Sequence, residues 1–321
     1  MNFFSAFQTV LVAMIEIVAV AWCGYIFVRR RWISEDALKG INDLLVRLFL
    51  PVLTVYHLLT HFQPERHRGW WIYPLLSIGM SLASLFAVRA LTFFPFRDSH
   101  DRRDAGALIA FQNCGYLPLV FVSGVFPPDI AGELITGILF FMQGFNFLFW
   151  GFGLQFLEGT RLSRFSLRKI ASPPFVALIV SLALIAARAQ PFIPTPLLRA
   201  AERVGNCTMP VALLILGGSL AGCLPAAGVR RPSLALAVAG KILVLPLFAL
   251  AVIILFKVPQ SMALLLLIQA AMPSAVNLSV AVLYQKRDGG IISQGVFLTH
   301  VLSMVTIPLF LALYAAWRGS W

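Results

Sequence analysis

The chain has 321 residues, of which 60% are hydrophobic and 12% charged, and its mean hydropathy is +0.87. A soluble domain carries about 25% charged residues, so this composition indicates an integral membrane protein that is solvated by the lipid bilayer. The formal net charge is +12, but the Lys and Arg residues lie in short loops between apolar runs, as membrane topology requires. We therefore exclude nucleic acid as a partner.

Ten apolar runs can form membrane helices, since one span needs about 20 mostly apolar residues. In chain order they cover residues 7–28, 41–60, 70–94, 105–126, 131–157, 172–189, 204–224, 232–256, 261–284 and 290–316. A polar linker over 158–171 separates two sets of five, so we predict an all-α membrane fold with one five-helix repeat at 1–157 and another at 172–321. No basic region precedes the first run, which favours a retained span over a cleaved signal peptide.

Basic residues are distributed unevenly between the two sides of the membrane. The loops after spans 1, 3, 5, 7 and 9, with their flanks, hold 17 Lys and Arg residues, and the opposite side holds seven. The positive-inside rule places the richer side in the cytoplasm, so both termini are expected outside. Two five-span halves that share a fold must enter the membrane in opposite directions. A shift of 159 residues supports this repeat, because it sets Pro51 on Pro210 and Pro118 on Asn277.

Two apolar runs are interrupted by residues that a smooth membrane helix avoids. The first interruption reads Phe-Gln-Asn-Cys-Gly-Tyr-Leu-Pro over 111–118, and the second reads Gln-Ala-Ala-Met-Pro-Ser-Ala-Val-Asn over 269–277. Irregular backbone at membrane depth is tolerated only where protein or a watery cavity surrounds it. A pair of interrupted spans at corresponding positions points to the binding site of a secondary transporter.

Five residues in these interruptions are candidates for binding a substrate. Pro118 and Pro273 cannot donate a backbone hydrogen bond, and Gly115 permits backbone angles that other residues avoid. The helix ends that result have free N–H groups, which can receive a carboxylate. Asn113 and Asn277 add side-chain donors and acceptors. The alternative is two prolyl kinks that neighbouring Asn residues stabilise.

Several motifs together resemble the auxin efflux carrier family. They are Leu50-Pro51, Ser-Pro-Pro at 172–174, the runs 209–212 and 216–220, Lys241 with Pro246, Pro-Ser-Ala-Val-Asn at 273–277 and Thr-Ile-Pro at 306–308. The resemblance implies ten spans in two inverted repeats, with spans 1, 2, 6 and 7 as a scaffold and spans 3–5 and 8–10 as a transport domain. Broken helices 4 and 9 would cross at its centre, and the cargo would be organic anions. The short linker is typical of a bacterial-type permease.

Other polar residues lie within apolar runs. In the fold that the resemblance implies, Thr54 faces the crossing, where it could bond the substrate or its own helix carbonyl. Lys241 must find a partner or a cavity, because a charge at the bilayer centre costs at least about 2.5–3.5 kcal/mol on insertion scales. It could balance an anionic substrate, take the place of a coupling cation, or tether helix carbonyls. Glu16, near the outer end of its span, could carry a proton or simply reach water. His300 could tune coupling or serve as a structural, hydrogen-bonded residue.

We therefore expect a multi-pass secondary transporter of the cell inner (plasma) membrane, an efflux carrier of a small organic anion such as a carboxylate, working by alternating access. A sodium- or proton-coupled importer on the same fold is the alternative, and the sequence leaves a homodimer open. An integral-membrane enzyme would use Glu16, His57 or His300, but these lie on different spans without a motif. No nucleotide-binding or metal-ligand motif occurs, and no C-x-x-C pair, so we expect no cofactor, metal or disulfide. The Phe-rich run 140–156 is expected to be a lipid-facing and packing surface rather than a ligand cage.

Overall fold

The computed structural model describes residues 2–91, 99–158, 171–223, 232–284 and 290–319, and its regular secondary structure in these ranges is helical apart from one isolated β-bridge. The linker 158–171 lies almost entirely outside them. In chain order, with η marking π- or 3-10-helical turns, the elements are α1 (Phe3–Arg29), α2 (Glu35–Leu44), η1 (Leu45–Phe49), α3 (Leu50–His61), α4 (Ile72–Leu91), α5 (Ser99–Ala110), α6 (Tyr116–Val125), α7 (Pro128–Leu148), η2 (Phe149–Gly153), α8 (Leu154–Glu158), α10 (Pro173–Ala186), η3 (Gln190–Phe192), α11 (Thr195–Asn206), α12 (Thr208–Gly222), α13 (Pro232–Ala239), η4 (Gly240–Val244), α14 (Leu245–Leu255), α15 (Gln260–Ala271), α16 (Asn277–Tyr284) and α17 (Gly290–Arg318).

Within the described ranges, six continuous helical stretches are long and apolar enough to cross a membrane. They are Phe3–Arg29, Glu35–His61, Pro128–Leu157, Thr195–Gly222, Pro232–Leu255 and Gly290–Arg318. Shorter apolar helices fall in the remaining four predicted spans, at Ile72–Ala87, Tyr116–Val125, Pro173–Ala186 and Gln260–Ala271. A multi-pass membrane protein is therefore confirmed, while the count of ten spans stays a prediction.

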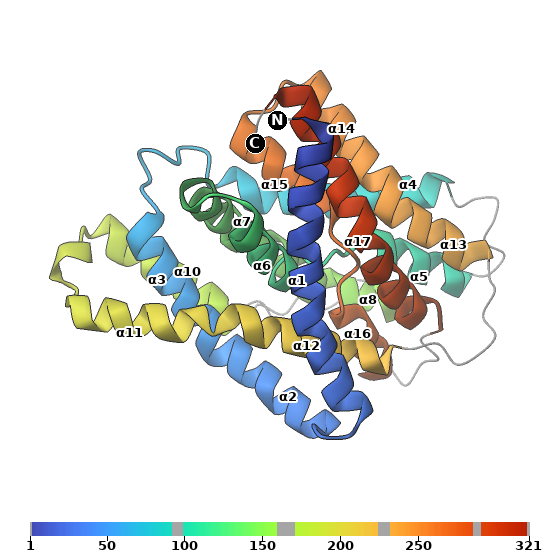
Figure 1. Cartoon of the computed structure of the whole chain (residues 1–321), viewed down its shortest axis with the longest axis horizontal. Helices are drawn as coiled ribbons and strands as arrows, with labels where there is room; N and C mark the ends of the chain where they lie inside the picture. The colour runs from blue at the N-terminus through green and yellow to red at the C-terminus, as the bar shows by residue number, and fades with distance from the viewer. Residues whose placement is uncertain (1, 92–98, 159–170, 224–231, 285–289, 320–321) are drawn as a thin grey trace.

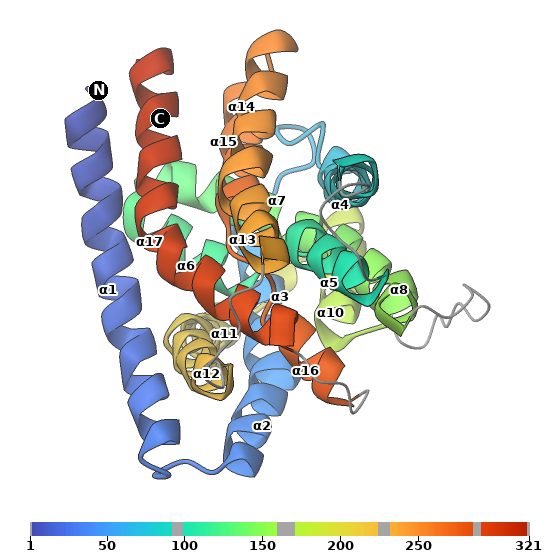
Figure 2. The same ribbon diagram turned by 90° about the vertical axis from the view of Figure 1, so that its right-hand side faces the viewer.

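Helix α1 forms one edge of the molecule, where it runs beside α17 and crosses α12 (Figures 1 and 2). The crossing is close, because Gly24 faces the backbone of Leu214 and Gly217 faces the backbone of Ala21. Small residues at such contacts let membrane helices approach and pack. Both ends of the chain lie at the same end of the molecule (Figure 1).

Two of the long stretches bend at a π-helical turn that precedes a proline. η1 leads into α3, whose second residue is Pro51, and η4 leads into α14, whose second residue is Pro246. A proline cannot donate to the carbonyl four residues earlier, so the preceding turn loses one α-helical bond and can widen.

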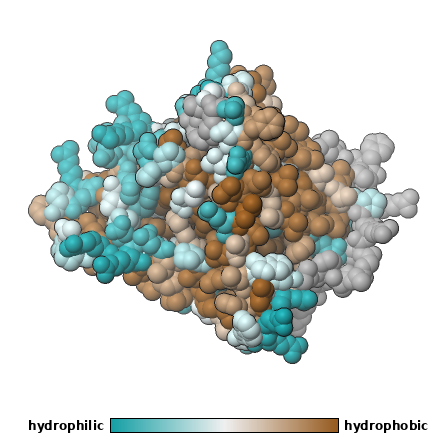
Figure 3. Space-filling view, in the orientation of Figure 1, coloured by the Kyte–Doolittle hydropathy of each residue, from teal (hydrophilic) through white to brown (hydrophobic). Residues whose placement is uncertain are grey.

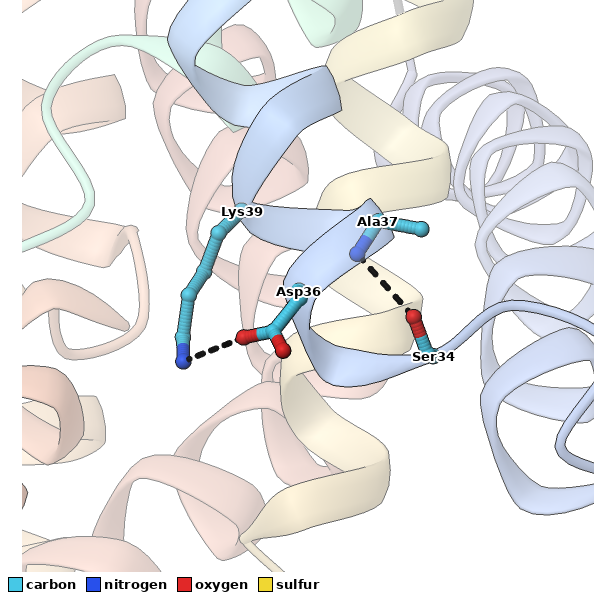
Figure 4. A network of polar contacts seen from close by, with 4 residues as sticks. All are labelled: Ser34, Asp36, Ala37 and Lys39. Carbon is cyan, nitrogen blue, oxygen red and sulfur yellow. Dashed lines mark hydrogen bonds and ion pairs between the residues drawn. The ribbon is translucent and has the colours of Figure 1, made fainter.

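The start of α2 lies at the end of its stretch that is predicted to face the cytoplasm. Ser34 caps α2 by accepting a hydrogen bond from the Ala37 N–H (3.2 Å), and Lys39 pairs with Asp36 (Figure 4).

Much of the Phe-rich run packs inside the protein, so the expectation that it also faces lipid is wrong for these residues. Phe140, Phe141, Phe145 and Phe149 on α7 and η2 are at most 3% exposed. Phe111 packs edge-on against Phe145 and Phe149, with ring centroids 6.0 and 5.1 Å apart. These aromatic rings therefore form part of the protein interior that supports the first interruption. The hydrophobic residues that face outward instead cover the middle of the view over α1, α13, α14 and α17, with hydrophilic residues toward the edges (Figure 3).

Candidate functional site

Both predicted interruptions are real breaks in helices. Helix α5 ends at Ala110 and α6 begins at Tyr116, while α15 ends at Ala271 and α16 begins at Asn277. The residues between them are extended or irregular and almost entirely buried. Polar backbone is thus enclosed by protein in the middle of apolar segments, which is the condition under which such breaks are tolerated.

The two breaks pair with each other as a very short antiparallel ladder. Gln112 and Ser274 form a β-bridge. The Asn113 N–H donates to the Pro273 carbonyl and the Ala275 N–H donates to the Phe111 carbonyl, both at 2.8 Å. Each break therefore satisfies backbone groups of the other, which links segments about 160 residues apart in the sequence.

Side chains add three more bonds around this crossing. The Ser274 hydroxyl donates to the Leu108 carbonyl of α5 (2.7 Å), and the Ser274 N–H donates to the Thr299 hydroxyl of α17 (3.2 Å). The Gln269 side-chain amide donates to the Cys114 carbonyl (3.0 Å). Ser274 and Gln269 are fully buried. The crossing is consequently held by α5, α15 and α17 together.

The first break is shaped by Asn113, Gly115 and Pro118. The side-chain oxygen of Asn113 accepts from the Leu117 N–H at the start of α6, at a long 3.5 Å. Gly115 has no Cβ, and an added one would meet the end of the Met142 side chain. Pro118 is the third residue of α6, where a missing N–H costs little because the first turn of a helix leaves its donors unpaired. Pro118 thus starts a half-helix rather than kinking a continuous one.

Asn113 and Asn277 are not equivalent in the structure. The helix ends of the two breaks correspond with an offset of 161 residues, from 110 to 271 and from 116 to 277. This offset differs by two from the 159 that aligned other spans, and it places Ser274 opposite Asn113 and Asn277 opposite Tyr116. Asn113 is buried within its break, whereas Asn277 is exposed at the first position of α16.

Lys241 lies in η4, beside the crossing. η4 packs against α5, α15 and α17, and Gly240 faces the Ile109 side chain of α5. Lys241 is 0% exposed and lies within electrostatic reach of Cys114. Its amino nitrogen has no hydrogen-bond partner among the residues that the structure describes. The interior next to the crossing therefore holds an ionisable amino group to which no described residue is hydrogen-bonded.

Other buried polar atoms at the crossing also lack a protein partner within the described ranges. They are both side-chain amide atoms of Gln112 and the side-chain oxygen of Gln269. A buried polar group without a hydrogen bond costs about 1–3 kcal/mol. Such a group is retained at this cost where a ligand or water completes its bonds. Asn113, Lys241 and both prolines were expected from the sequence, whereas Gln112, Gln269, Ser274 and Thr299 were not. A signal existed for the two Gln residues, since amides inside membrane helices face protein rather than lipid.

The remaining candidate residues lie in several places. The Thr54 hydroxyl is buried and donates to the Leu50 carbonyl of its own helix (2.8 Å). Of the two roles expected for Thr54, this is the bond to its own helix rather than a bond to the substrate. His57 reaches α7, where a ring nitrogen lies 2.9 Å from the Gly132 carbonyl and 3.1 Å from the Thr136 hydroxyl. His300 is buried on α17, one residue from Thr299, and its Nδ1 bonds the Val296 carbonyl (2.8 Å).

Glu16 is placed differently from the expectation. Because α1 begins at Phe3 and has 27 residues, Glu16 lies at its midpoint rather than near its outer end, and its side chain is exposed. No group of three His, Cys, Asp or Glu residues that could hold a metal ion occurs within the described part of the chain.

A polar crossing enclosed by apolar helices is the arrangement of a membrane transport protein. The sequence profile of the family described as Membrane transport protein matches residues 9–164 and 160–311. The chain belongs to this family, the auxin efflux carrier family, which confirms the resemblance found in the motifs. A Schizosaccharomyces pombe protein described as an uncharacterized transporter is 25% identical over 171 residues, or 49% of this chain. The matched part spans 38% of that relative's length.

Proposed function

We propose that this chain is a secondary transporter that carries a small organic anion, a carboxylate, by alternating access through the crossing of the two broken helices. The observation that carries the proposal is Lys241, a fully buried amino group that the described residues leave unpartnered beside the crossing. An anionic head group would stabilise the charged form of this amino group and pair with it. The buried Gln112 and Gln269 amides would supply hydrogen bonds that recognise carboxylate oxygens.

Two inverted five-helix repeats would provide the moving parts. Spans 1, 2, 6 and 7 would form the scaffold, and spans 3–5 and 8–10 would form a transport domain that includes the crossing, η4 and α17. The packing of α1 on α12 and of α10 on α3 supports this division, because each contact joins the first span of one half to the second span of the other. The broken helices, the crossing and Lys241 would then move together with the bound anion.

Efflux of an anion needs no coupling ion to be favourable. A negative charge that leaves a negative cytoplasm gains about 2.3 kcal/mol per 100 mV of membrane potential. The membrane potential alone therefore suffices for export. In the proposed orientation, both termini and the outer half of each broken span face away from the cytoplasm. Coupling to a proton or to sodium would turn the same site into an importer, and an imposed gradient of either ion in vesicles distinguishes the two.

The decisive experiment replaces Lys241 in purified protein reconstituted into proteoliposomes. A thermal-shift screen of small carboxylates first identifies a ligand, since binding to the native state raises the apparent melting temperature. Lys241→Met should reduce the flux of that ligand at least tenfold without lowering the melting temperature, because a buried unpaired charge is itself unfavourable. Lys257→Met, at an exposed lysine, is the matched control.

The same measurement separates binding from a structural role of Lys241. If the lysine only tethers helix carbonyls, Lys241→Met should lower the melting temperature and the flux together. Wild-type flux in Lys241→Met would refute the proposed site.

A further inference from the structure

A carboxylate occupies the middle of the exposed face of α1. Glu16 is 13 residues from either end of this helix, which corresponds to about 20 Å at 1.5 Å per residue. Its neighbour Ile15 is 53% exposed, as expected for a residue in contact with lipid. No cation pairs with Glu16 in the part of the chain that the structure describes. A charge facing hydrocarbon at this depth is expensive, so water must reach the side chain or a partner must neutralise it.

A shallow, open groove lies on the surface beside Glu16. It has a volume of about 320 Å³, lies between α1 and α6, and is lined by Gln8, Thr9, Val12, Ala13, Glu16 and Gly124. This volume is far above what a single water molecule needs. Gln8, Val12 and Glu16 are four residues apart on one face of α1. The groove therefore follows this face, with the polar side chains of Gln8 and Glu16 on either side of the apolar Val12.

The groove is next to α6, the half-helix that follows the first break. Helix α6 begins at Tyr116, immediately after the first break, and Gly124 lies near its other end. Ser123, beside Gly124, is within 3.1 Å of the Met209 sulfur of α12. The groove is thus bordered by α1 on one side and by a broken helix, which also contacts α12, on the other. These elements belong to the two bodies that would move apart in the proposed function.

We propose that the groove between α1 and α6 is a water-filled vestibule that reaches the middle of the membrane, and that Glu16 acts there as a charge filter for the transported anion. The filter rests on the proposed function, whereas the vestibule does not. A fixed negative charge in the vestibule repels a dianion about twice as strongly as a monoanion, because the Coulomb energy scales with the charge of the ligand. Glu16 would therefore favour monocarboxylates over dicarboxylates.

Thiol accessibility tests the vestibule. In a background with the exposed Cys23 and Cys207 changed to Ser, single cysteines are placed by Glu16→Cys, Thr9→Cys and, as the lipid-facing control at the same depth, Ile15→Cys. A charged, membrane-impermeant thiol reagent is applied to intact cells and, separately, to inverted vesicles. Thiolates form only in water, so Glu16→Cys and Thr9→Cys should react from one side at least tenfold faster than Ile15→Cys.

Equal, slow reaction at all three positions would overturn the vestibule. If Glu16→Cys fails to fold, Val12→Cys, at a groove position one helical turn away, takes its place in the comparison with Ile15→Cys. The filter is tested by Glu16→Gln in proteoliposomes, where the ratio of dicarboxylate to monocarboxylate flux should rise several-fold. An unchanged ratio would overturn the filter. Absence of any carboxylate flux in wild-type protein would instead refute the proposed function and leave the labelling result standing.

Discussion

Asn113 and Asn277 flank different breaks and occupy different environments. Asn113 is buried, its backbone N–H bonds the other break, and its side chain accepts from the start of α6. Asn277 is exposed at the first position of α16, a helix start at which a polar side chain and the N–H groups can contact a ligand directly. Under the proposed function, Asn113 would position the start of α6 and Asn277 would contact the anion directly.

Alanine substitutions should separate these two roles. Asn113→Ala should lower both the flux and the melting temperature, because loss of a helix-capping side chain costs about 0.5–2 kcal/mol. Asn277→Ala should lower the flux strongly with little change in melting temperature. Flux assays and thermal unfolding of the same preparations provide the measurement, with Asn42→Ala on α2 as the control. Wild-type flux in both variants would count heavily against a site at the crossing.

Among the helices, the α1–α12 contact depends on the absence of side chains. A Cβ on Gly217 would collide with the Ala21 carbonyl, while a Cβ on Gly222, in the same helix, would meet nothing within 4 Å. Gly217→Ala should therefore separate the helices and destabilise the protein by about 1–3 kcal/mol. Gly222→Ala should be neutral or slightly stabilising, since Ala favours a helix more than Gly does. Apparent melting temperatures in one detergent test the pair, and equal values would contradict this packing.

The breaks themselves were predictable because their signal is local. Pro118, Gly115 and Pro273 stand out in apolar runs, and each is found where a helix starts or stops. The bridge between Gln112 and Ser274 was not predictable, because backbone pairing between distant segments leaves no local pattern. Hydropathy also did not predict that Phe140 and its neighbours are buried. Apolar side chains are equally favourable in a protein interior and in contact with lipid tails, so hydropathy cannot distinguish the two environments.

For the candidate site, composition indicated the charged residue but not its surroundings. Lys241 stands out as a cation in an apolar run, and its burial follows from that position. Its place beside the crossing depends on how η4 packs against α5, α15 and α17, which the sequence does not report. Gln269 and Thr299 escaped notice because single polar residues in membrane helices commonly bond their own helix.

At the scale of the whole molecule, α12 contacts both half-helices that follow the breaks. The Ser123 hydroxyl of α6 lies 3.1 Å from the Met209 sulfur near the start of α12. The Cys223 thiol at the other end of α12 lies 3.3 Å from the Ser279 hydroxyl of α16. Alternating access through the crossing requires that α12 and the half-helices separate at one end and then at the other.

A reversible cross-link tests that requirement. Ser279→Cys places a second thiol opposite the native Cys223, at a separation that a disulfide can bridge after a small adjustment of side chains. Oxidation should form the disulfide and reduce carboxylate flux at least tenfold, and a reducing agent should restore it. The same variant with Cys223→Ser, which cannot form this bond, should keep its flux in oxidant. Undiminished flux with the disulfide fully formed would show that α12 and α16 stay together throughout transport, and the opening would then have to occur elsewhere in the molecule.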